Sequence, residues 1–417
     1  MARVFVTGMG VVSPIGIGRE AFERSVFAGE SGAAPIERFD ASGIDRNIAC
    51  EVKGFVPRDF LTAAQARHAG RCSAMTVAAA RMAVEQAGMQ PEELAGARTA
   101  VIVGTTMGEA NILGELEAAW IHQGYDAVPS LKITRYGTTL LPIHVARAFG
   151  TRGMVQTLPA ACAAGNYALG FAADQIRAGR ADVAIAGASE IIEKLQFAGF
   201  VRLGAVAPER CQPFDADRKG LLVGEGSGMF VLESEAHAVR RGATPIAEVG
   251  GYGLACDAHH ITRPHPEGEG SIDAMQRAIE SSGVDADAVD FINAHGTGTQ
   301  ANDRVESKVI RHVFGDKRVP VTSIKSMLGH CMGAASAIEA VSCVLSIQRR
   351  RYPPTINSEQ QDEAIDLDVV ANVAQEGPAD LVLNNALAFG GYDAVLALAR
   401  PGVLPDEVGF GGREAAS

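Results

Sequence analysis

Apolar segments that alternate with helix-like segments are the feature that most constrains the fold of this chain. The apolar segments are rich in Val, Ile, Ala and Gly, as expected of strands that are covered on both faces. In the first half the predicted strands are residues 3–12, 99–104, 154–158 and 181–188. The predicted helices there are residues 19–28, 74–88 and 163–177. This alternation favours an α/β fold with parallel strands and helices on the faces of the sheet.

The second half of the chain repeats this order and predicts an internal duplication. Its predicted strands are residues 247–253, 289–294 and 319–324, and its predicted helices are residues 271–282 and 333–349. Residues 83–89 resemble residues 278–284, whereas Gly165 aligns with Gly333 at a different spacing. The unequal spacing predicts insertions in the first half, around residues 30–65 and 105–150.

The duplication predicts two halves and a short tail. We expect the first half at residues 1–245 and the second at residues 246–400. Residues 401–417 are rich in Gly, Pro and acidic side chains and are expected to be flexible. The alignment of Gly165 with Gly333 places Cys162 opposite His330, so the two halves are expected to bring these side chains into one cavity.

Composition excludes several classes of function. The chain has 417 residues, of which 47% are hydrophobic and 21% charged, as in a globular enzyme. A net charge of −12 gives no general basic surface for nucleic acid or for an anionic membrane. No apolar run reaches transmembrane length. The seven cysteines are scattered without a CxxC pair, which indicates a reducing compartment and a cytoplasmic protein.

Cys162 lies at a predicted strand-to-helix turn, directly after Pro159. Backbone N–H groups and the positive end of the helix dipole meet at such a position and favour a thiolate. We expect the thiol pKa to fall by about one unit from its usual value near 8.5, towards neutrality. From this stretch alone the alternative stays open that Cys162 is a small buried apolar residue.

Three further segments are candidates for chemistry. His295 follows a predicted strand in a loop rich in Gly and Thr, where ligands collect in α/β folds. His330 follows Lys325 before the second long helix, and Phe389 lies between the last two apolar strands. The glycine cluster at residues 224–228 lacks the Lys-Ser/Thr of a phosphate-binding loop and runs into a strand, so we interpret it as structural. The adjacent His259 and His260 lack Cys or acidic ligands at metal-site spacing, and no metal is expected.

Taken together and in this order, the motifs resemble the β-ketoacyl-acyl carrier protein synthases, in particular the elongating, FabF-like condensing enzymes with the thiolase fold. The resemblance covers about residues 3–398. The matching motifs are residues 6–14, the turn at Cys162, residues 213–218, 224–226 and 293–297, Lys325 with residues 329–330, and residues 389–391. It implies two duplicated α/β halves in a layered α-β-α-β-α arrangement. It also implies an acyltransferase that extends a fatty acid or polyketide chain by decarboxylative Claisen condensation.

The resemblance implies roles for individual residues. Cys162 would carry the acyl chain, and His295 and His330 would hold the malonyl thioester carbonyl while carbon dioxide leaves. The backbone N–H groups of Cys162 and Phe389 would form the oxyanion hole. Lys325 would orient the His330 region, with Glu306 as its buried acidic partner; a purely structural ion pair is the alternative for these two.

Other residues match the substrate channel of the resembled family. Thr262, Thr297 and Thr299 would line the tunnel for the pantetheine arm. Met107 and Phe200 would lie at the acyl pocket and contribute to chain-length selection.

One motif departs from the pattern of the resembled family. The usual run is Gly-Phe-Gly-Gly-Thr-Asn, whereas this chain has Ala388-Phe389-Gly390-Gly391-Tyr392-Asp393. Because Ala is stiffer than Gly, this departure bears on the movement of Phe389. With Met107 and Arg263, Tyr392 points to an unusual acyl chain, such as a polyene or another polyketide.

The resemblance also implies partners. The substrates would arrive on an acyl carrier protein, without a resident cofactor, and the chain would form a homodimer or a heterodimer with a related ketosynthase-like subunit. Candidate basic residues for the acidic carrier protein are Arg58, Arg67, Arg71 and Arg202.

Two alternative functions remain open from the sequence. One is a thiolase acting on coenzyme A thioesters, which usually uses a second Cys late in the chain, and none follows Cys343 here. The other is a non-condensing chain-length-factor-like subunit, which would lack the nucleophile.

Overall fold

The computed structural model describes residues 2–96 and 98–405. Within them, the strands of the first half form one side of a 12-stranded sheet in the order β6–β5–β7–β8–β1. Their bounds are β1 Val4–Ser13, β5 Thr99–Gly104, β6 Val155–Leu158, β7 Val183–Glu190 and β8 Gly226–Ser234. The order continues as β9–β16–β15–β10–β11–β13 in the second half. These strands are β9 Ala247–Cys256, β10 Phe291–Asn293, β11 Pro320–Thr322, β13 Asp368–Val369, β15 Leu381–Ala388 and β16 Tyr392–Ala399.

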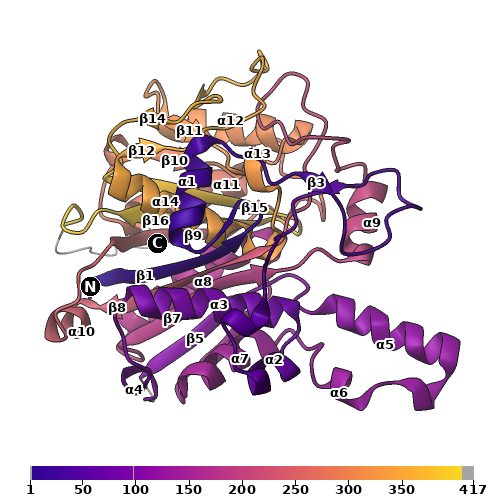
Figure 1. Ribbon diagram of the computed structural model, residues 1–417. Helices are drawn as coiled ribbons and strands as arrows, with labels where there is room; N and C mark the ends of the chain where they lie inside the picture. Colours follow the sequence, from indigo (N-terminus) through magenta and orange to yellow (C-terminus); the bar gives the residue numbers. More distant parts are fainter. Residues whose placement is uncertain (1, 97, 406–417) are drawn as a thin grey trace, which may run out of the picture.

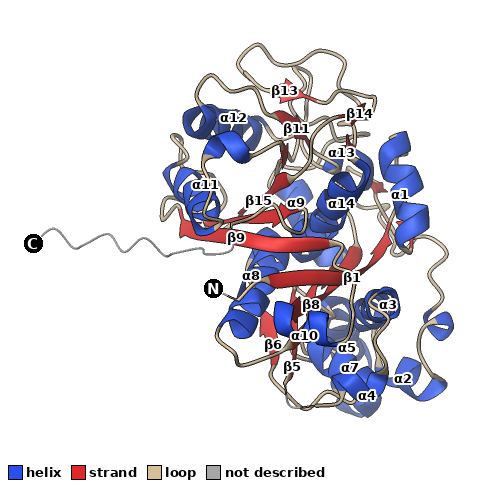
Figure 2. Cartoon of the chain, turned by 90° about the vertical axis from the view of Figure 1, so that its left-hand side faces the viewer, coloured by secondary structure: helices blue, strands red, loops and turns tan. Residues whose placement is uncertain are grey.

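The two sides of the sheet have the same pairing pattern, which confirms the predicted duplication. In the first half β5 is parallel to β6 and β7, whereas β7–β8 and β8–β1 are antiparallel. In the second half β10 is parallel to β11 and β15, whereas β15–β16 and β16–β9 are antiparallel. The halves join where β1 and β9 pair over Val4–Val6 and Ala247–Val249, and Figure 2 shows these two strands side by side.

The expectation of parallel pairing is therefore wrong for two pairs of strands in each half. Residues 191–225 connect β7 to β8 at one end of the sheet, and residues 389–391 connect β15 to β16 in the same way. Because neither connection crosses back over the face of the sheet, the strands that it joins must run in opposite directions. The α/β layering survives, since helices still cover both faces.

Two long helices, α8 (Ala164–Arg177) and α14 (Ala335–Arg349), pack against each other between the two halves of the sheet. Their approach is very close, since a Cβ added to Gly165 would lie 2.4 Å from the backbone nitrogen of Ala337. The outer face of the first half is covered by α3 (Arg71–Gln86) and α7 (Leu140–Phe149), and that of the second by α11 (Glu269–Ser281). Next to α11 lies α12 (Gln300–Phe314). This is the predicted α-β-α-β-α arrangement, with the second half above the first in Figure 1.

The remaining elements are short or lie outside the layers. In the first half they are β2 Gly16–Ile17, α1 Arg19–Ala28, β3 Ala34–Pro35, β4 Ile48–Ala49, α2 Ala63–His68, α4 Pro91–Leu94, α5 Ala110–Gln123, α6 Ser130–Ile133, α9 Lys194–Arg202 and α10 Glu235–Arg240. In the second half they are α13 Lys325–Leu328, β12 Arg351–Tyr352 and β14 Gln375–Glu376. The predicted insertions hold β3, β4 and α5–α7, and α5 and α6 form an arm that projects from the body in Figure 1.

The repeat alignment needs a correction of three residues. A 3₁₀ turn precedes each central helix, at Ala161–Ala163 before α8 and at Met332–Ala334 before α14. The first residue of each turn has a positive φ, 46° at Ala161 and 47° at Met332. Cys162 is therefore equivalent to Gly333 and not to His330. The error arose because the two glycines that were aligned serve different contacts, Gly165 against Ala337 and Gly333 against Thr106.

Two further predictions concern the membrane and the tail. In residues 2–96 and 98–405 no helix is long and apolar enough to span a membrane. The tail predicted at residues 401–417 lies for the most part outside the described residues. The division of the chain at residue 245 stays a prediction.

Candidate active site

Cys162 lies at the mouth of α8, where β6 ends and a single 3₁₀ turn leads into the helix. Its side chain is buried. The backbone N–H groups of Phe389 and of Cys162 itself lie close enough to the sulfur to lower the pKa of the thiol. These are the two donors that the resemblance assigned to an oxyanion hole, and here they surround the atom that would bear the acyl group.

The predicted fall in the pKa of Cys162 is wrong for the free protein. Burial raises the pKa of the Cys162 thiol to about 11, whereas Lys325 and the two backbone N–H groups lower it by less. The sequence pattern located the helix mouth correctly but gave no measure of how far the sulfur is withdrawn from water. The resting side chain is therefore a thiol, and its proton must leave as the acyl group arrives.

His295 and His330 form a pair whose rings are nearly perpendicular, with centroids 5.3 Å apart. The Nδ1 atom of His330 accepts a hydrogen bond from the backbone N–H of Met332 at 3.2 Å. The Nδ1 atom of His295 lies 3.4 Å from the Lys325 ammonium, which can only donate. Both rings therefore carry their proton on Nε2. Burial, and then the charge of Lys325, lower both imidazole pKa values well below the usual range, so both rings are neutral donors.

The expected ion pair between Lys325 and Glu306 is not formed. Lys325, which is fully buried, instead makes a short ion pair with Glu339 on α14. Glu339 was missed because it lies inside an apolar helix pattern, nine residues after His330. A buried charged residue in such a pattern needs a charged partner, and this was the available indication of its role.

Glu306 has a different function from the one expected. Its carboxylate accepts hydrogen bonds from the backbone N–H groups of His295 at 2.7 Å and Gly296 at 2.8 Å. The side chain amides of Asn385 and Asn302 donate to the same carboxylate at 3.3 and 3.4 Å. Glu306 thus fixes the backbone that carries His295, from the first turns of α12.

The backbone around His330 is held by the glycine cluster that was interpreted as structural. The His330 N–H donates to Leu222 at 2.7 Å, and the Gly224 N–H donates back to the His330 carbonyl at 2.8 Å. A Cβ at Gly224 would lie 2.4 Å from the carbonyl oxygen of Leu328. Close backbone packing therefore requires a glycine at position 224. The segment has a structural role, as interpreted, and that role is to position His330.

These groups meet in a cavity of about 480 Å³. Eight of the predicted site residues line it: Cys162, Phe200, Thr262, His295, Thr297, Thr299, His330 and Phe389. The wall also includes the exposed residues Leu203 and Arg263, so the cavity extends from the buried sulfur to the surface. Lys325 and Glu306 lie behind the wall. Met107 does not line this cavity; the backbone N–H groups of residues 106–108 donate to the Glu190 carboxylate.

The turn that carries Phe389 closes one side of the cavity. The Phe389 ring stacks on Phe200 with centroids 5.8 Å apart. Gly390 and Gly391 have φ values of 87° and 77°, a region that glycine adopts without strain. Ala388 belongs to β15, where it pairs with Tyr392. The turn is therefore anchored by a regular strand at Ala388, and its freedom lies in the two glycines.

Four arginines were predicted to contact an acidic carrier protein, and three of them are accessible. Arg58, Arg67 and Arg202 are exposed. Arg71 is not available for a docking surface, because it pairs with the fully buried Glu225 at 2.7 Å. His259 and His260 are exposed. Across the described residues, no group of three or more His, Cys, Asp or Glu side chains could hold a metal ion.

A buried cysteine at a helix mouth, backed by two neutral imidazole donors in a duplicated α/β fold, defines a thiolase-fold acyltransferase. Residues 1–238 match the β-ketoacyl synthase N-terminal domain family, and residues 246–359 match the β-ketoacyl synthase C-terminal domain family. The chain belongs to the β-ketoacyl synthase family and is a condensing enzyme.

Individual relatives agree with this assignment along nearly the whole chain. The chain is 38% identical to nodulation protein E of Rhizobium sp. (strain N33) over 95% of this chain and 98% of that protein. It is 37% identical to 3-oxoacyl-[acyl-carrier-protein] synthase 2 of Coxiella burnetii over the same shares of the two chains. Among solved structures, a chain of the ishigamide ketosynthase/chain length factor superposes with a TM-score of 0.93 at 43% identity, covering 96% of this chain and 100% of that one. The thiolase alternative is not favoured by these findings.

Proposed function

We propose that this chain is the condensing subunit of a type II polyketide system, which extends an acyl chain on an acyl carrier protein with malonyl units. The observation that carries the proposal is the set of groups on the wall of one cavity. The wall holds a cysteine nucleophile with two backbone N–H donors near it, and two neutral imidazole donors. The named relatives, a carrier-protein synthase and a ketosynthase/chain length factor, support the same substrate class.

In the first step the sulfur of Cys162 attacks the thioester carbonyl of the acyl carrier substrate. Negative charge on the carbonyl oxygen is held by the N–H groups of Phe389 and Cys162. The carbon–sulfur bond to the pantetheine breaks, and the proton of the Cys162 thiol passes to the departing pantetheine thiolate. The products are acyl-Cys162 and a free carrier thiol.

In the second step a malonyl thioester lies with its carbonyl oxygen against the Nε2–H groups of His295 and His330. Loss of carbon dioxide leaves an enolate, whose negative charge these two donors stabilise without carrying a charge of their own. The enolate carbon attacks the acyl-Cys162 carbonyl, and the Cys162 thiolate leaves. The product is a β-ketoacyl carrier protein that is longer by two carbons. No metal or resident cofactor is required.

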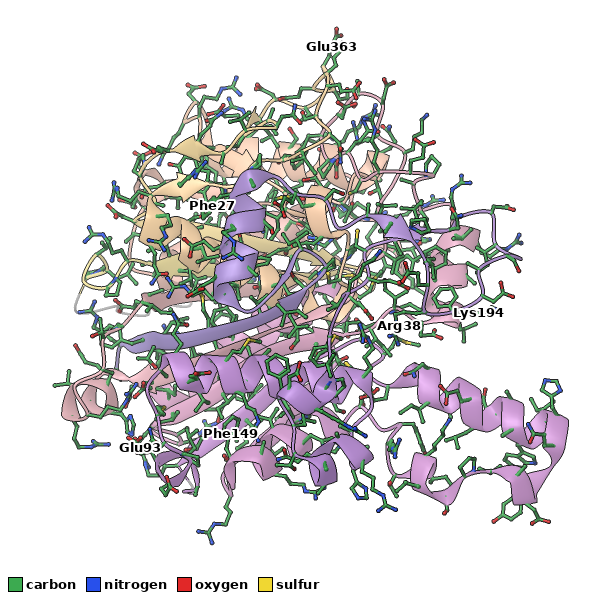
Figure 3. All side chains as sticks on the ribbon, in the orientation of Figure 1. Phe27, Arg38, Glu93, Phe149, Lys194 and Glu363 are labelled. Atoms are coloured by element: carbon green, nitrogen blue, oxygen red, sulfur yellow. The ribbon has the colours of Figure 1, made fainter. Side chains whose placement is uncertain are left out.

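A second ketosynthase-fold chain is the expected partner. Strand β6 is an edge of the sheet; Met154, directly before it, is 40% exposed, and Val155, its first residue, is 36% exposed. The arm and the loop after it add the exposed side chains Leu113, Trp120, Ile121, Tyr125, Ile133 and Tyr136. The arm itself projects from the body in Figure 3. An exposed edge and an apolar arm on one chain favour burial by another chain. The ketosynthase/chain length factor relative supports a heterodimer.

The direct test is intact-mass analysis after incubation with a panel of acyl carrier proteins of different chain length and unsaturation. We expect acylation of one cysteine, lost in Cys162→Ala, and release of a β-ketoacyl carrier protein when malonyl carrier protein is added. Acylation of a different residue would contradict the nucleophile assignment. Native mass spectrometry of the chain alone and with a chain-length-factor subunit tests the partner, and a stable monomer under both conditions would contradict the heterodimer.

A further inference from the structure

Two carboxyl groups beside the Phe389 turn each have an oxygen with no partner. Asp393, the second residue of β16, is buried, and its Oδ1 accepts a hydrogen bond from the Ser271 hydroxyl at 3.0 Å. Asp257, directly after β9, accepts the backbone N–H of His265 on Oδ2 at 2.8 Å. The Oδ2 of Asp393 and the Oδ1 of Asp257 are buried, and among the described residues no hydrogen-bond donor is placed for either.

The two unpartnered oxygens face the same point. A Cβ added to Gly270, in the first turn of α11, would lie 2.5 Å from Oδ2 of Asp393 and 2.8 Å from Oδ1 of Asp257. Two ionised carboxylates in this position would repel each other, because both facing oxygens are buried. A single proton between these oxygens removes both the repulsion and the two unsatisfied acceptors.

The pair is joined to the reacting atoms through a short path of backbone. The Asp257 N–H donates to the carbonyl oxygen of Gly391 at 2.9 Å. Asp393 lies two residues after Gly391, at the start of β16, and both aspartates line the cavity with Cys162. The N–H of Phe389, on this turn, is one of the groups that lower the pKa of the Cys162 thiol. A displacement of β9 from β16 at this point therefore moves the oxyanion donor.

We propose that Asp257 and Asp393 share one proton, and that the resulting acid–carboxylate hydrogen bond positions the Phe389 turn against Cys162. The proposal rests on the function proposed above, and it makes the two aspartates positioning residues. Loss of the proton leaves two negative charges at the base of the turn and weakens its attachment to the end of β9.

The surroundings allow the proton to be lost in the alkaline range. Burial, and then the charge of Asp257, raise the pKa of Asp393 to about 8, and Glu306 on α12 acts in the same direction. The other groups around the pair are Tyr167 on α8, Glu269 at the start of α11, His265 in the loop after β9, and Lys219 and Arg263 on the cavity wall. Among these groups Lys219 and Arg263 are the permanent cations, and both are exposed.

The test compares the native chain with Asp393→Asn, because an amide donates to Asp257 at any pH without a shared proton. The rate of Cys162 acylation by an acyl carrier protein is measured by intact mass from pH 6.5 to 9.5, with Asp316→Asn as an exposed control. We expect the ratio of Asp393→Asn to native rates to rise about tenfold between pH 7 and pH 9, since one unit above its pKa a group keeps about a tenth of its protons. The ratio for Asp316→Asn is expected to stay constant.

The outcomes separate this inference from the proposed function. A constant ratio for Asp393→Asn, with normal acylation of the native chain, would overturn the shared proton and leave the function standing. Failure of the native chain to acylate Cys162 at any pH would instead contradict the function. If Asp393→Asn does not fold, Asp257→Asn places the amide on the other member of the pair. The ratio of Asp257→Asn to native acylation rates is then expected to rise in the same way.

Discussion

The turns before α8 and before α14 have the same backbone and opposite chemical roles. Each begins with a residue at positive φ, Ala161 or Met332, and leads through one 3₁₀ turn into a long buried helix. In the first turn the next residue is Cys162, which faces the cavity. In the second it is Gly333, where a Cβ would lie 2.5 Å from the backbone nitrogen of Thr106. The duplicated frame thus offers two helix mouths, and packing leaves room for a side chain in only one.

The second half contributes its chemistry from positions whose equivalents in the first half carry no reactive side chain. His330 is equivalent to Pro159, and Glu339 on α14 is equivalent to Ala168 on α8. Glu339 neutralises Lys325, whose charge adds to the effect of burial in lowering the pKa of both imidazoles. One half therefore presents a nucleophile and the other presents neutral donors. The predictions below break or sharpen this division, from the largest expected effect to the smallest.

The Lys325–Glu339 pair should show the largest effect on stability. Glu339→Gln leaves a buried ammonium without its counter-ion, and breaking such a pair costs about 3–5 kcal/mol. The double variant Lys325→Met with Glu339→Gln removes both charges and makes the second half resemble the first, so it should recover most of the loss. Chemical denaturation of the native chain, the single variants Glu339→Gln and Lys325→Met, and the double variant measures the coupling. Additive losses in the double variant would show that the two side chains do not act as a pair.

The two imidazoles should affect one step and not the other. His330→Ala or His295→Ala removes a donor to the enolate oxygen, and we expect decarboxylation of malonyl carrier protein to fall by about 10²–10³. Acylation of Cys162 should survive, because its oxyanion donors are backbone N–H groups. Release of carbon dioxide and intact mass report the two steps separately. An equal loss of both steps would contradict the division between the two halves.

The equivalent positions Cys162 and Gly333 should respond differently to the same new residue. Gly333→Ala forces a Cβ against the backbone of Thr105 and Thr106, and we expect a loss of about 3 kcal/mol because backbone cannot move aside as a side chain can. Cys162→Ala removes only a sulfur and should leave the unfolding temperature nearly unchanged. Gly114→Ala, in α5 with open space around it, is the matched control and should be neutral or slightly stabilising. Equal stability of all three variants would show that packing does not exclude a side chain from the second mouth.

The sequence predicted the frame well because the frame follows from local patterns. Apolar runs located the central strands, and helical spacing located α3, α8, α11 and α14 within a few residues. The repeat between residues 83–89 and 278–284 placed α3 and α11 in equivalent positions, as the structure confirms. Strand direction was predicted less well, since it depends on where connections cross the sheet and leaves no periodic pattern in the sequence.

The site was predicted correctly for residues that the resemblance named. It was missed where the depth of burial determines which groups pair and how their pKa values shift. Eight predicted residues lie on one cavity, but Glu306 was assigned to Lys325 when its carboxylate holds the backbone of His295. Spacing along the chain cannot show which of two acids, Glu306 or Glu339, is nearer to an ammonium in space. The pKa of Cys162 was mispredicted for the same reason, because the depth of burial is a property of the assembled halves.

The protonation of Cys162 gives a test of that correction. With its pKa raised to about 11 by burial, the thiolate fraction increases about tenfold for each pH unit below that value. Alkylation of Cys162 by iodoacetamide should therefore accelerate about 100-fold from pH 7 to pH 9. Peptide mapping in a Cys256→Ser background removes the contribution of the exposed cysteine. An alkylation rate that levels off by pH 8 would contradict the raised pKa and support the lower pKa that the helix mouth alone predicts.

The smallest expected effect concerns the strained backbone that the two turns share. An Ala in the left-handed region costs roughly 1 kcal/mol relative to Gly, part of which is offset by the greater freedom of Gly in the unfolded chain. Ala161→Gly should therefore stabilise the protein by less than about 1 kcal/mol. Met332→Gly relieves the same strain but removes a side chain that is 1% exposed, so it should destabilise by about 2 kcal/mol or more. Thermal unfolding of both variants measures the difference. Destabilisation by Ala161→Gly would mean that the Cβ of Ala161 contributes more through packing than its backbone angle costs, and the two turns would then differ in energy as well as in chemistry.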